Sequence, residues 1–352
     1  MVERRVADLI RRSHAALDTE TLQHEVLRRL RTVMTVDAAF FATVDPATLL
    51  FTSAVSESPL REATPEFLAN EFGTADVNKF ADLARAPVPV RTLDGATGND
   101  RSRSARYREL MAPLGLGDEL RVALRSGSTV WGVLCLHRED SQLGFSDADT
   151  QLIQRVAPHV AAGLRHSTLL VQTQEHAACQ AAGLVVLDAE TLSISTINAA
   201  AESMLRELAR TDIDRGDAAP FVVQAIARLA RDAARSGNPT VPTVRLRSGV
   251  GRWLALQGSM LDGRGAADQV AVIIEPAGRS DIASLLLDAY ELTRRERGVT
   301  ELVLRGYSTR EIVDELSISA HTVQDHLKSV FAKFGVSSRR QLVGALLSTV
   351  RA

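Results

Sequence analysis

The sequence predicts an α+β multidomain protein, with two mixed α/β domains followed by an all-α C-terminal domain. At roughly 100–200 residues per domain, a chain of this length holds two or three domains, and this one has 352 residues. Strand-like and helix-like segments alternate as far as residue 276, whereas the pattern after Asp281 is helical only. A Glu-Pro-Ala-Gly linker at 275–278 separates the two regions. We therefore expect domains at residues 1–172, 176–278 and 281–352.

The overall composition is that of a globular protein without a cationic surplus. Hydrophobic residues make up 45% and charged residues 24% of the chain, which excludes disorder as the main state. The formal net charge of −2 gives the whole chain no attraction for nucleic acid or an anionic membrane. Two cysteines cannot form a disulfide framework and suit a reducing compartment. With no apolar run of membrane-spanning length and no signal peptide, we expect a cytoplasmic protein.

The first domain is predicted to combine a hairpin-rich sheet with long helices. The apolar spacing of residues 1–34 is helical, and a second helix can restart at Thr19. Ser146 is placed to be the N-cap of the helix that runs to Leu170, with Asp149 as its partner. The expected helices are residues 1–34, 65–84 and 146–170, and the expected strands are residues 38–44, 49–55, 88–93, 119–125 and 130–137.

The second domain is predicted to be a meandering antiparallel sheet with two helices. Gly-rich turns separate its last three strands, and Ser236-Gly237-Asn238-Pro239 ends its second helix. The expected strands are residues 183–188, 193–198, 241–246, 253–261 and 270–275, and the expected helices are residues 199–209 and 221–235.

The C-terminal region has the spacing of a helix-turn-helix. A short helix at 308–316 precedes a tight turn at Ser317-Ile318, and a longer helix begins at Ser319. The longer helix carries one apolar stripe that should face a core. The stripe consists of Val323, Leu327, Val330 and Phe334. In a helix-turn-helix, the second helix enters the DNA major groove.

The same region closely resembles the DNA-binding domain of LuxR-type transcriptional regulators. The resemblance rests on the stretches 292–297, 306–312, 319–328 and 333–339. It implies four helices, of which the third (about 319–334) reads DNA and the fourth (about 338–349) contributes to dimerisation. The sequence departs from the family in two places: Gly298 lies inside the first helix, and Gln324 stands where many relatives have Lys.

The polar face of the third helix supplies candidate DNA contacts. Gln324 can pair with adenine, Asp325 can accept from cytosine, and Lys328 can reach guanine or a phosphate. The predicted base-reading set is Val323, Gln324, Asp325 and Lys328. The predicted backbone-positioning set is Ser308, Arg310, Ser319, Thr322, His326, Arg339 and Arg340. Between His321 and Arg340 the charge balance is +3. The alternatives are a helical protein-interaction domain and, for His326, a partly buried side chain bonded to backbone.

The first domain resembles a GAF domain, and the second is similar to a PAS domain. The GAF resemblance rests on residues 116–121, 131–134 and 145–149, and the PAS resemblance on residues 183–188, 198–202 and 251–254. Both resemblances imply a sensor scaffold, for which we expect a small organic effector and no cofactor. The candidate effector pocket is Phe40, Phe41, Tyr107, Met111, Arg121, Trp131, Val133, Cys135 and His137. The alternative is that Arg121 and His137 simply meet solvent or a loop.

Together these features predict a ligand-responsive transcription regulator that binds double-stranded DNA as a homodimer. Residues 1–34 and the helix 146–170 are the expected dimer seam. We find no catalytic motif and expect no enzymatic activity. The pairs His159/His166 and His176/Cys179 are too sparse to predict a metal site. Two alternatives stay open, in which the sensor domains only dimerise the DNA binder, or the chain is an accessory to a signalling enzyme with no DNA role.

Overall fold

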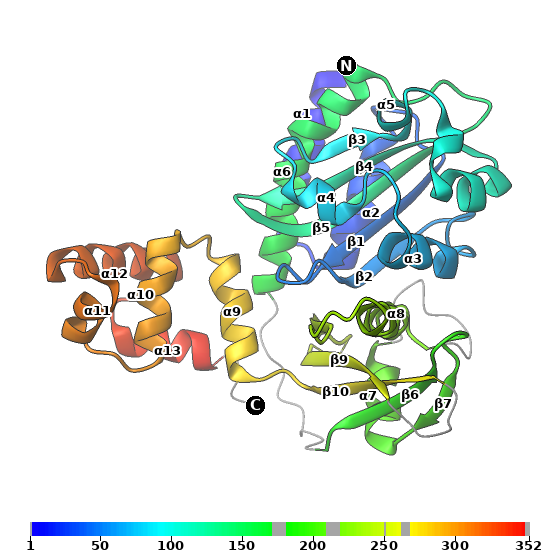
Figure 1. Cartoon of the computed structure of the whole chain (residues 1–352). Coiled ribbons are helices and arrows are strands. Elements are labelled where there is room, and N and C mark those ends of the chain that lie inside the picture. Colours follow the sequence, from blue (N-terminus) through cyan, green and yellow to red (C-terminus); the bar gives the residue numbers. More distant parts are fainter. Residues whose placement is uncertain (1, 171–180, 209–218, 250, 262–267, 349–352) are drawn as a thin grey trace. The chain divides into compact units, whose positions relative to one another are not determined.

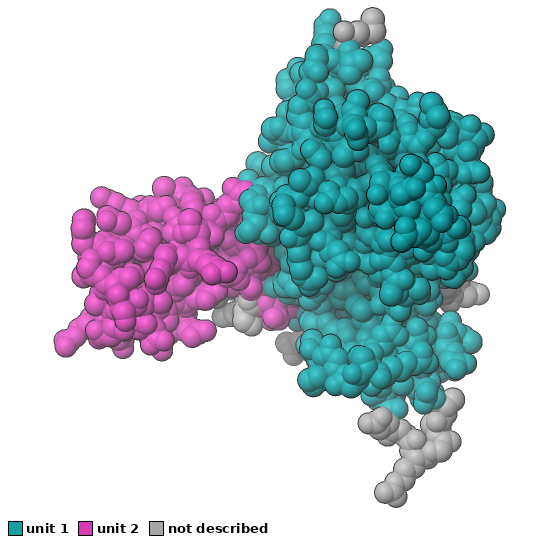
Figure 2. Space-filling view, turned by 45° about the horizontal axis from the view of Figure 1, so that its top comes forward, with its two compact units in different colours: residues 1–171, 179–276 teal, residues 172–178, 277–352 magenta. Residues whose placement is uncertain are grey.

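The computed structural model describes residues 2–170, 181–208, 219–249, 251–261 and 268–348. Two compact units are present, one comprising the described residues up to Pro276 and the other beginning at Ala277 (Figure 2). His176 and Cys179 lie outside the described residues. No described helix is both long enough and apolar enough to cross a membrane.

The first unit contains two five-stranded antiparallel sheets (Figure 1). The first sheet has the order β2-β1-β5-β4-β3, and its central hairpin is formed by the two longest strands, β4 and β5. Its strands are β1 (Ala38–Val44), β2 (Phe51–Ser56), β3 (Val90–Thr92), β4 (Leu116–Ser126) and β5 (Thr129–Glu139). The two predicted hairpins of this sheet are confirmed.

Helices cover the apolar face of the first sheet. They are α1 (Val2–Ser13), α2 (Thr19–Leu30) and α6 (Asp147–Leu170). Asp18 caps α2 by accepting a hydrogen bond from the Thr21 backbone N–H, so the predicted restart at Thr19 is confirmed. A Cβ at Gly132 would lie 2.6 Å from Cδ1 of Leu164, because α6 packs directly on β5 there.

Shorter elements cover the opposite face of the first sheet. They are α3 (Thr64–Gly73), α4 (Phe80–Arg85), the π-helical turn η2 (Tyr107–Met111) and nearby short turns at α5 (Leu93–Thr97), η1 (Arg101–Arg103) and η3 (Ala112–Leu114). The single helix expected at 65–84 is wrong: Thr74 adopts extended backbone, and Asn78 has a φ of 57°. These two residues interrupt the helix and leave α3 and α4 as separate elements.

The second sheet has the strand order β7-β6-β10-β9-β8. When its strands are numbered from one in chain order, this is the same order as in the first sheet. Its strands are β6 (Gly183–Asp188), β7 (Ile194–Ile197), β8 (Thr243–Arg247), β9 (Trp253–Leu261) and β10 (Gln269–Pro276), with helices α7 (Ala199–Leu208) and α8 (Phe221–Arg235). Helix α8 packs on β9 and β10 and also contacts α3 and β2. The rings of Phe51 and Phe221 stack with centroids 6.3 Å apart, so the two sheets share one apolar core.

The second unit is helical, as predicted. Its helices are α9 (Arg279–Ala289), α10 (Arg294–Leu304), α11 (Thr309–Leu316), α12 (Ala320–Phe334) and α13 (Arg339–Ser348). Capping boxes begin α10 at Thr293 and α11 at Ser308, and the Ser319 hydroxyl caps α12. Gly335 ends α12 in the left-handed region with a φ of 64°. Helices α10 to α13 match the four helices that the resemblance implied.

Candidate nucleic-acid interface and sensor core

Helices α11 and α12 form a helix-turn-helix with a buried inner face. Ser317 ends α11 with a φ of 50°, and the chain turns before α12 begins at Ala320. Val323, Leu327 and Val330 are at most 1% exposed and lie in the core of the domain. The structure therefore separates Val323 from the rest of the predicted base-reading set, because its side chain is not available at the surface.

The outer face of α12 presents the other three predicted base-reading residues. Gln324, Asp325 and Lys328 are all exposed. Their spacing of one, three and four residues places them on neighbouring positions of one helical surface. The His321 Nε2 lies 3.7 Å from the Asp325 Oδ2, an exposed contact that leaves the carboxylate accessible. This face offers an amide, a carboxylate and an ammonium group side by side.

The predicted backbone-positioning residues fall into two groups. Ser308 and Ser319 cap helices, and the Thr322 hydroxyl lies 2.8 Å from that of Ser319. Arg310 and Arg340 are exposed, and His326 is half-buried.

Arg339 has a structural role in the free protein. Its guanidinium donates to the Tyr307 carbonyl at 3.0 Å and to the Thr309 hydroxyl at 3.1 Å. Arg339 thus connects α13 to the beginning of α11, and it carries its charge beside the helix-turn-helix.

Glu296 links α10 to α12 through Lys333. The Lys333 Nζ lies 2.6 Å from Glu296 Oε2, and the Ser329 hydroxyl donates to Oε1 at 2.5 Å. Burial raises the pKa of Glu296, but hydrogen bonds from Lys333, Ser329 and Thr293 outweigh it and hold that pKa at about 2. Lys333, one of the cations counted between His321 and Arg340, is therefore neutralised by an acid outside that range. Lys328 and Arg340 stay exposed in this range, and Arg310 is exposed on α11.

The first sheet brings together most of the predicted effector-pocket residues. Phe40, Met111, Val133 and Cys135 belong to one apolar cluster, and Tyr107 packs at its edge. Arg121 and His137 lie on the same strand faces as Cys135, as the pairing of β4 with β5 requires. They are 0% and 1% exposed, so neither meets solvent, but Arg121 Nη1 donates to the carbonyl of Asn78 in the loop between α3 and α4.

Two predicted pocket residues, Phe41 and Trp131, are buried outside that apolar cluster. The backbone carbonyl of Phe41 accepts from Gln23 of α2. Trp131 lies beside a register shift between β4 and β5, which interrupts the alternation of side chains. The nine predicted residues therefore do not all belong to that cluster.

Buried ion pairs occupy the centre of the first domain. Arg121 Nη2 lies 2.7 Å from Glu71 Oε2 of α3, and the Arg121 guanidinium lies over the Phe80 ring at 3.9 Å. Arg106 Nη2 lies 2.6 Å from Glu119 Oε2. All four ionised side chains are at most 4% exposed and pair across elements distant in sequence. Charged groups fill the space where the sequence suggested an organic ligand.

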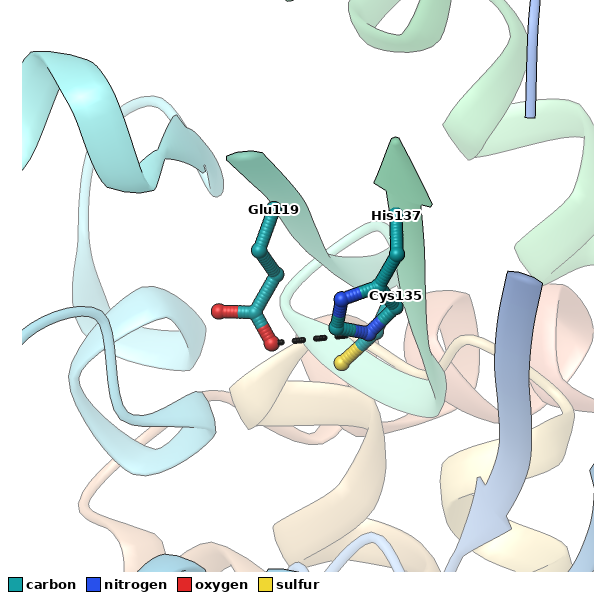
Figure 3. A group of neighbouring side chains, drawn as sticks. All are labelled: Glu119, Cys135 and His137. Carbon is teal, nitrogen blue, oxygen red and sulfur yellow. Dashed lines mark ion pairs between the residues drawn. The ribbon is translucent and has the colours of Figure 1, made fainter. Parts of the chain in front are cut away.

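Glu119, which belongs to one of these ion pairs, lies close to Cys135 and His137 (Figure 3). Glu119 Oε1 is 3.8 Å from His137 Nε2, and Arg121 Nε is 3.4 Å from Cys135 Sγ. Burial lowers the pKa of His137 to about 4 and raises that of Cys135 to about 12. Burial also disfavours ionised Glu119, but Arg106 and Arg121 outweigh this and hold its pKa at about 2.

Sequence reasoning missed Glu71, Arg106 and Glu119. A signal existed for Glu119, because it stands two residues before Arg121 on one strand and so shares its face. No periodic signal marks Arg106, which precedes η2, or Glu71, which is one of several polar residues on α3.

An open hollow of about 520 Å³ lies at one end of the first sheet. Its lining residues are Asp37, Ala38, Ser58, Pro59, Leu114, Gly115, Leu116, Glu139 and Ser141. None of the nine predicted effector residues lines it.

Comparison with known proteins identifies the C-terminal domain. Residues 290–346 match the model of the bacterial regulatory proteins of the luxR family. Over 56 residues the chain is 46% identical to the spore germination protein GerE of Bacillus subtilis (strain 168), covering 16% of this chain and 76% of that protein. The chain belongs to the luxR family of bacterial regulatory proteins.

Other comparisons of this luxR-family chain cover separate parts. Residues 18–164 match the GAF domain model, which confirms the predicted sensor fold of the first domain. A putative HTH-type regulator of Mycobacterium tuberculosis (strain ATCC 25618 / H37Rv), Rv0890c, is 50% identical over 52 residues, which are 15% of this chain and 6% of that protein. The chain thus spans most of GerE but only a small part of this longer regulator.

Two solved structures share weak likeness with the luxR-family chain. VqmA bound to DPO is 19% identical, with a TM-score of 0.21, over 48% of this chain and 82% of that chain. The GAF domain of a sensor histidine kinase from Bacillus halodurans is 15% identical, with a TM-score of 0.28, over 43% of this chain and 97% of that chain.

Proposed function

We propose that this luxR-family regulator reads duplex DNA with the exposed face of α12. The observation that carries the proposal is the outward display of Gln324, Asp325 and Lys328 on a helix whose opposite face is buried. These are the side-chain types that pair with adenine, cytosine and guanine edges in the major groove. Arg310 and Arg340 would position the phosphate backbone.

The proposed regulator acts in the cytoplasm as a homodimer with two half-sites about one helical turn apart. Helices α1, α2 and α6 are the proposed dimer seam, and domain boundaries at 1–172, 176–278 and 281–352 remain part of the proposal. A PAS-like second domain is supported by its sheet, which repeats the strand order of the GAF sheet. Small-molecule binding in the GAF or PAS-like domain would shift the population of DNA-competent dimers.

A second candidate gives the sensor domains a role in dimerisation only. It is favoured by the dense packing around Arg121, whose guanidinium pairs with Glu71 and lies over the Phe80 ring. In that case DNA binding depends on protein concentration through dimer formation, and small molecules do not change it.

Selection of bound fragments from random duplex DNA tests the proposed function. The purified full chain should enrich one motif, and Lys328→Ala should abolish that enrichment while the thermal unfolding curve stays unchanged. Arg206→Ala is the matched control, because Arg206 is an exposed cation of α7 and its removal changes the net charge equally. Absence of an enriched motif, or a Lys328→Ala variant that binds like the unaltered chain, would contradict the proposal.

One further measurement distinguishes effector control from a role in dimerisation only. The enriched DNA is titrated with protein with and without a small-molecule library, and the dimer fraction is measured in the same samples. A compound that changes the affinity supports effector control. Affinity that follows only the dimerisation equilibrium supports the second candidate.

A further inference from the structure

We propose that Glu119, Cys135 and His137 form a buried binding site for one divalent transition-metal ion of borderline softness, such as Zn²⁺ (Figure 3). Their carboxylate oxygen, thiol sulfur and imidazole nitrogens lie within 4.8 Å of one another. Oxygen, sulfur and nitrogen from these three residue types are the ligands that Zn²⁺ takes in proteins, and three protein ligands leave a fourth position open. The sequence alone predicted no metal site.

The β4–β5 hairpin brings the three residues together. Glu119 and His137 are direct partners in the antiparallel register, and Cys135 precedes His137 by two residues on the same face of β5. The site therefore lies on the two longest strands of the first sheet. Strands hold ligand side chains more accurately than loops do, which favours a preformed site.

Three buried atoms of the site lack a hydrogen-bond partner among the described residues, although Glu119 Oε1 also lies 3.6 Å from the Arg121 Nε. Glu119 Oε1 and both ring nitrogens of His137 have no hydrogen-bond partner within the described part of the chain, although both residues are at most 1% exposed. Buried polar atoms without partners are costly, and a bound ion or water would satisfy them. The 3.8 Å between Glu119 Oε1 and His137 Nε2 is close to the edge of a zinc tetrahedron, roughly 3.4 Å for bonds of ~2.1 Å.

The charged groups around the site are balanced before an ion binds, and the Cys135 thiolate would offset one of the two charges of a divalent ion. The carboxylates of Glu71, Asp76 and Glu119 balance the cations of Arg106, Arg121 and Lys79, since these groups contact or neighbour one another. Coordination would convert the Cys135 thiol to a thiolate, with its proton released to solvent. That thiolate would accept from Arg121 Nε, which already lies 3.4 Å from the sulfur. Outer hydrogen bonds of this kind orient metal ligands.

The packing also limits the size of the occupant. Arg106 and Arg121 pack against Glu119 and Cys135, and the Arg121 guanidinium lies over the Phe80 ring, so the site suits a single ion and no organic molecule. The open hollow includes Ala38, which is the register partner of His137 on β1.

Titration of the metal-free, reduced full chain with Co²⁺ tests the site. Co²⁺ is a spectroscopic substitute for Zn²⁺, and its thiolate ligand gives a charge-transfer band in the near ultraviolet. We expect the band to saturate at one ion per chain and to disappear when Zn²⁺ is added. Cys135→Ser should abolish it, and His137→Gln should weaken Co²⁺ binding by more than the roughly 10–100-fold that loss of an outer partner costs.

Two controls show whether the band arises at these three residues. Cys179→Ser, at the chain's other cysteine, should keep the band, and circular dichroism should show that all variants remain folded. No band in the unaltered chain would mean that an ordered water fills the site, and a band that survives Cys135→Ser would place the metal elsewhere. Either result overturns the proposal. Metal binding is measured without DNA. A negative result would therefore overturn the metal site without contradicting the proposal that α12 reads DNA.

Discussion

Asp45 and Arg245 are joined by a buried ion pair that links the two sheets across 200 residues of sequence. Asp45 lies in the turn after β1 and is 1% exposed, and Arg245 lies in β8. The Asp45 carboxylate accepts from the guanidinium at 2.7 and 3.0 Å and from the Arg245 backbone N–H at 2.8 Å. The GAF sheet and the second sheet are therefore connected by charge as well as by their shared apolar core.

Removal of the Asp45 charge should uncouple the unfolding of the two sheets. Asp45→Asn removes the carboxylate charge that faces the buried Arg245 guanidinium, and loss of one partner of a buried pair costs about 3–5 kcal/mol. Trp131 in the first sheet and Trp253 in the second are the chain's two tryptophans. Trp131→Phe keeps the tryptophan of the second sheet, and Trp253→Phe keeps that of the first. The denaturant unfolding curves of these two variants should coincide when Asp45 is present and separate when Asp45→Asn is added.

The exposed Asp82→Asn variant is the control for this experiment, because it removes one carboxylate from α4 without breaking a buried pair. Coincident curves in both Asp45→Asn backgrounds would show that the apolar core alone couples the sheets.

Local sequence patterns were sufficient to predict most elements of this fold. The β1–β2 and β4–β5 hairpins and helix α8 follow from alternation, turn residues and apolar periodicity, which are properties of neighbouring residues. Ion pairs such as Arg121 with Glu71 join residues 50 positions apart, and Asp45 with Arg245 join residues 200 apart. Such pairs depend on tertiary packing, so no local pattern could have found them.

For the DNA interface, sequence reasoning placed Gln324, Asp325 and Lys328 on the exposed face but overstated the free charge. Lys333 looked available because its partner, Glu296, lies 37 residues away on α10. The buried position of Val323 follows from the same apolar stripe that the sequence shows.

Glu296→Gln should destabilise the luxR-family domain. The variant weakens the hydrogen bonds with Lys333 and Ser329, and loss of charge-assisted bonds of this kind costs about 1–3 kcal/mol. Because the folded-state pKa is depressed to about 2, the ionised Glu296 contributes its full stabilisation above the ordinary value of 4.5. That stabilisation should disappear as the pH falls from 4.5 toward 2.

Thermal unfolding of Glu296→Gln and the unaltered chain between pH 2 and 7 measures this effect. The difference between the two should be largest near neutral pH and vanish in acid. Glu315→Gln, an exposed residue of α11, should show no such difference. If the stability difference between Glu296→Gln and the unaltered chain stayed constant with pH, Glu296 would act through packing rather than through its charge.

Acidification should weaken the packing of α1 on α6 through a histidine pair. His14 Nε2 lies 3.0 Å from His159 Nδ1, and burial together with the neighbouring His14 lowers the pKa of His159. The folded chain therefore binds fewer protons here than the unfolded chain, so stability is lost as the pH falls below the ordinary histidine value of 6.5.

Hydrogen exchange of the α1 amides at pH 5.5 and 7.5 checks this expectation. Exchange corrected for intrinsic pH effects should be faster at pH 5.5, and His14→Gln should reduce the difference. An equal difference in His14→Gln would assign the pH response to other groups.

Arg340 and Arg339 should affect DNA binding in different ways. Arg340→Ala removes an exposed cation, so it should weaken binding to every sequence and reduce the slope of log K against log salt by about 0.9 for each lost phosphate contact. Arg339→Ala should do the same and also lower thermal stability, because Arg339 bonds to Tyr307 and Thr309. Salt titrations and melting curves of both variants measure the two effects, and an Arg340→Ala slope equal to that of the unaltered chain would exclude a phosphate contact there.

The core shared by the two sheets limits how this regulator can be re-engineered. Phe51 of β2 and Phe221 of α8 cover each other, so a chimera that keeps only the GAF segment would expose both an aromatic surface and the unpaired Asp45. Such a graft would aggregate rather than transfer its response to another DNA-binding domain. The transferable module is the whole segment up to Pro276, and a fusion point belongs between Pro276 and α9.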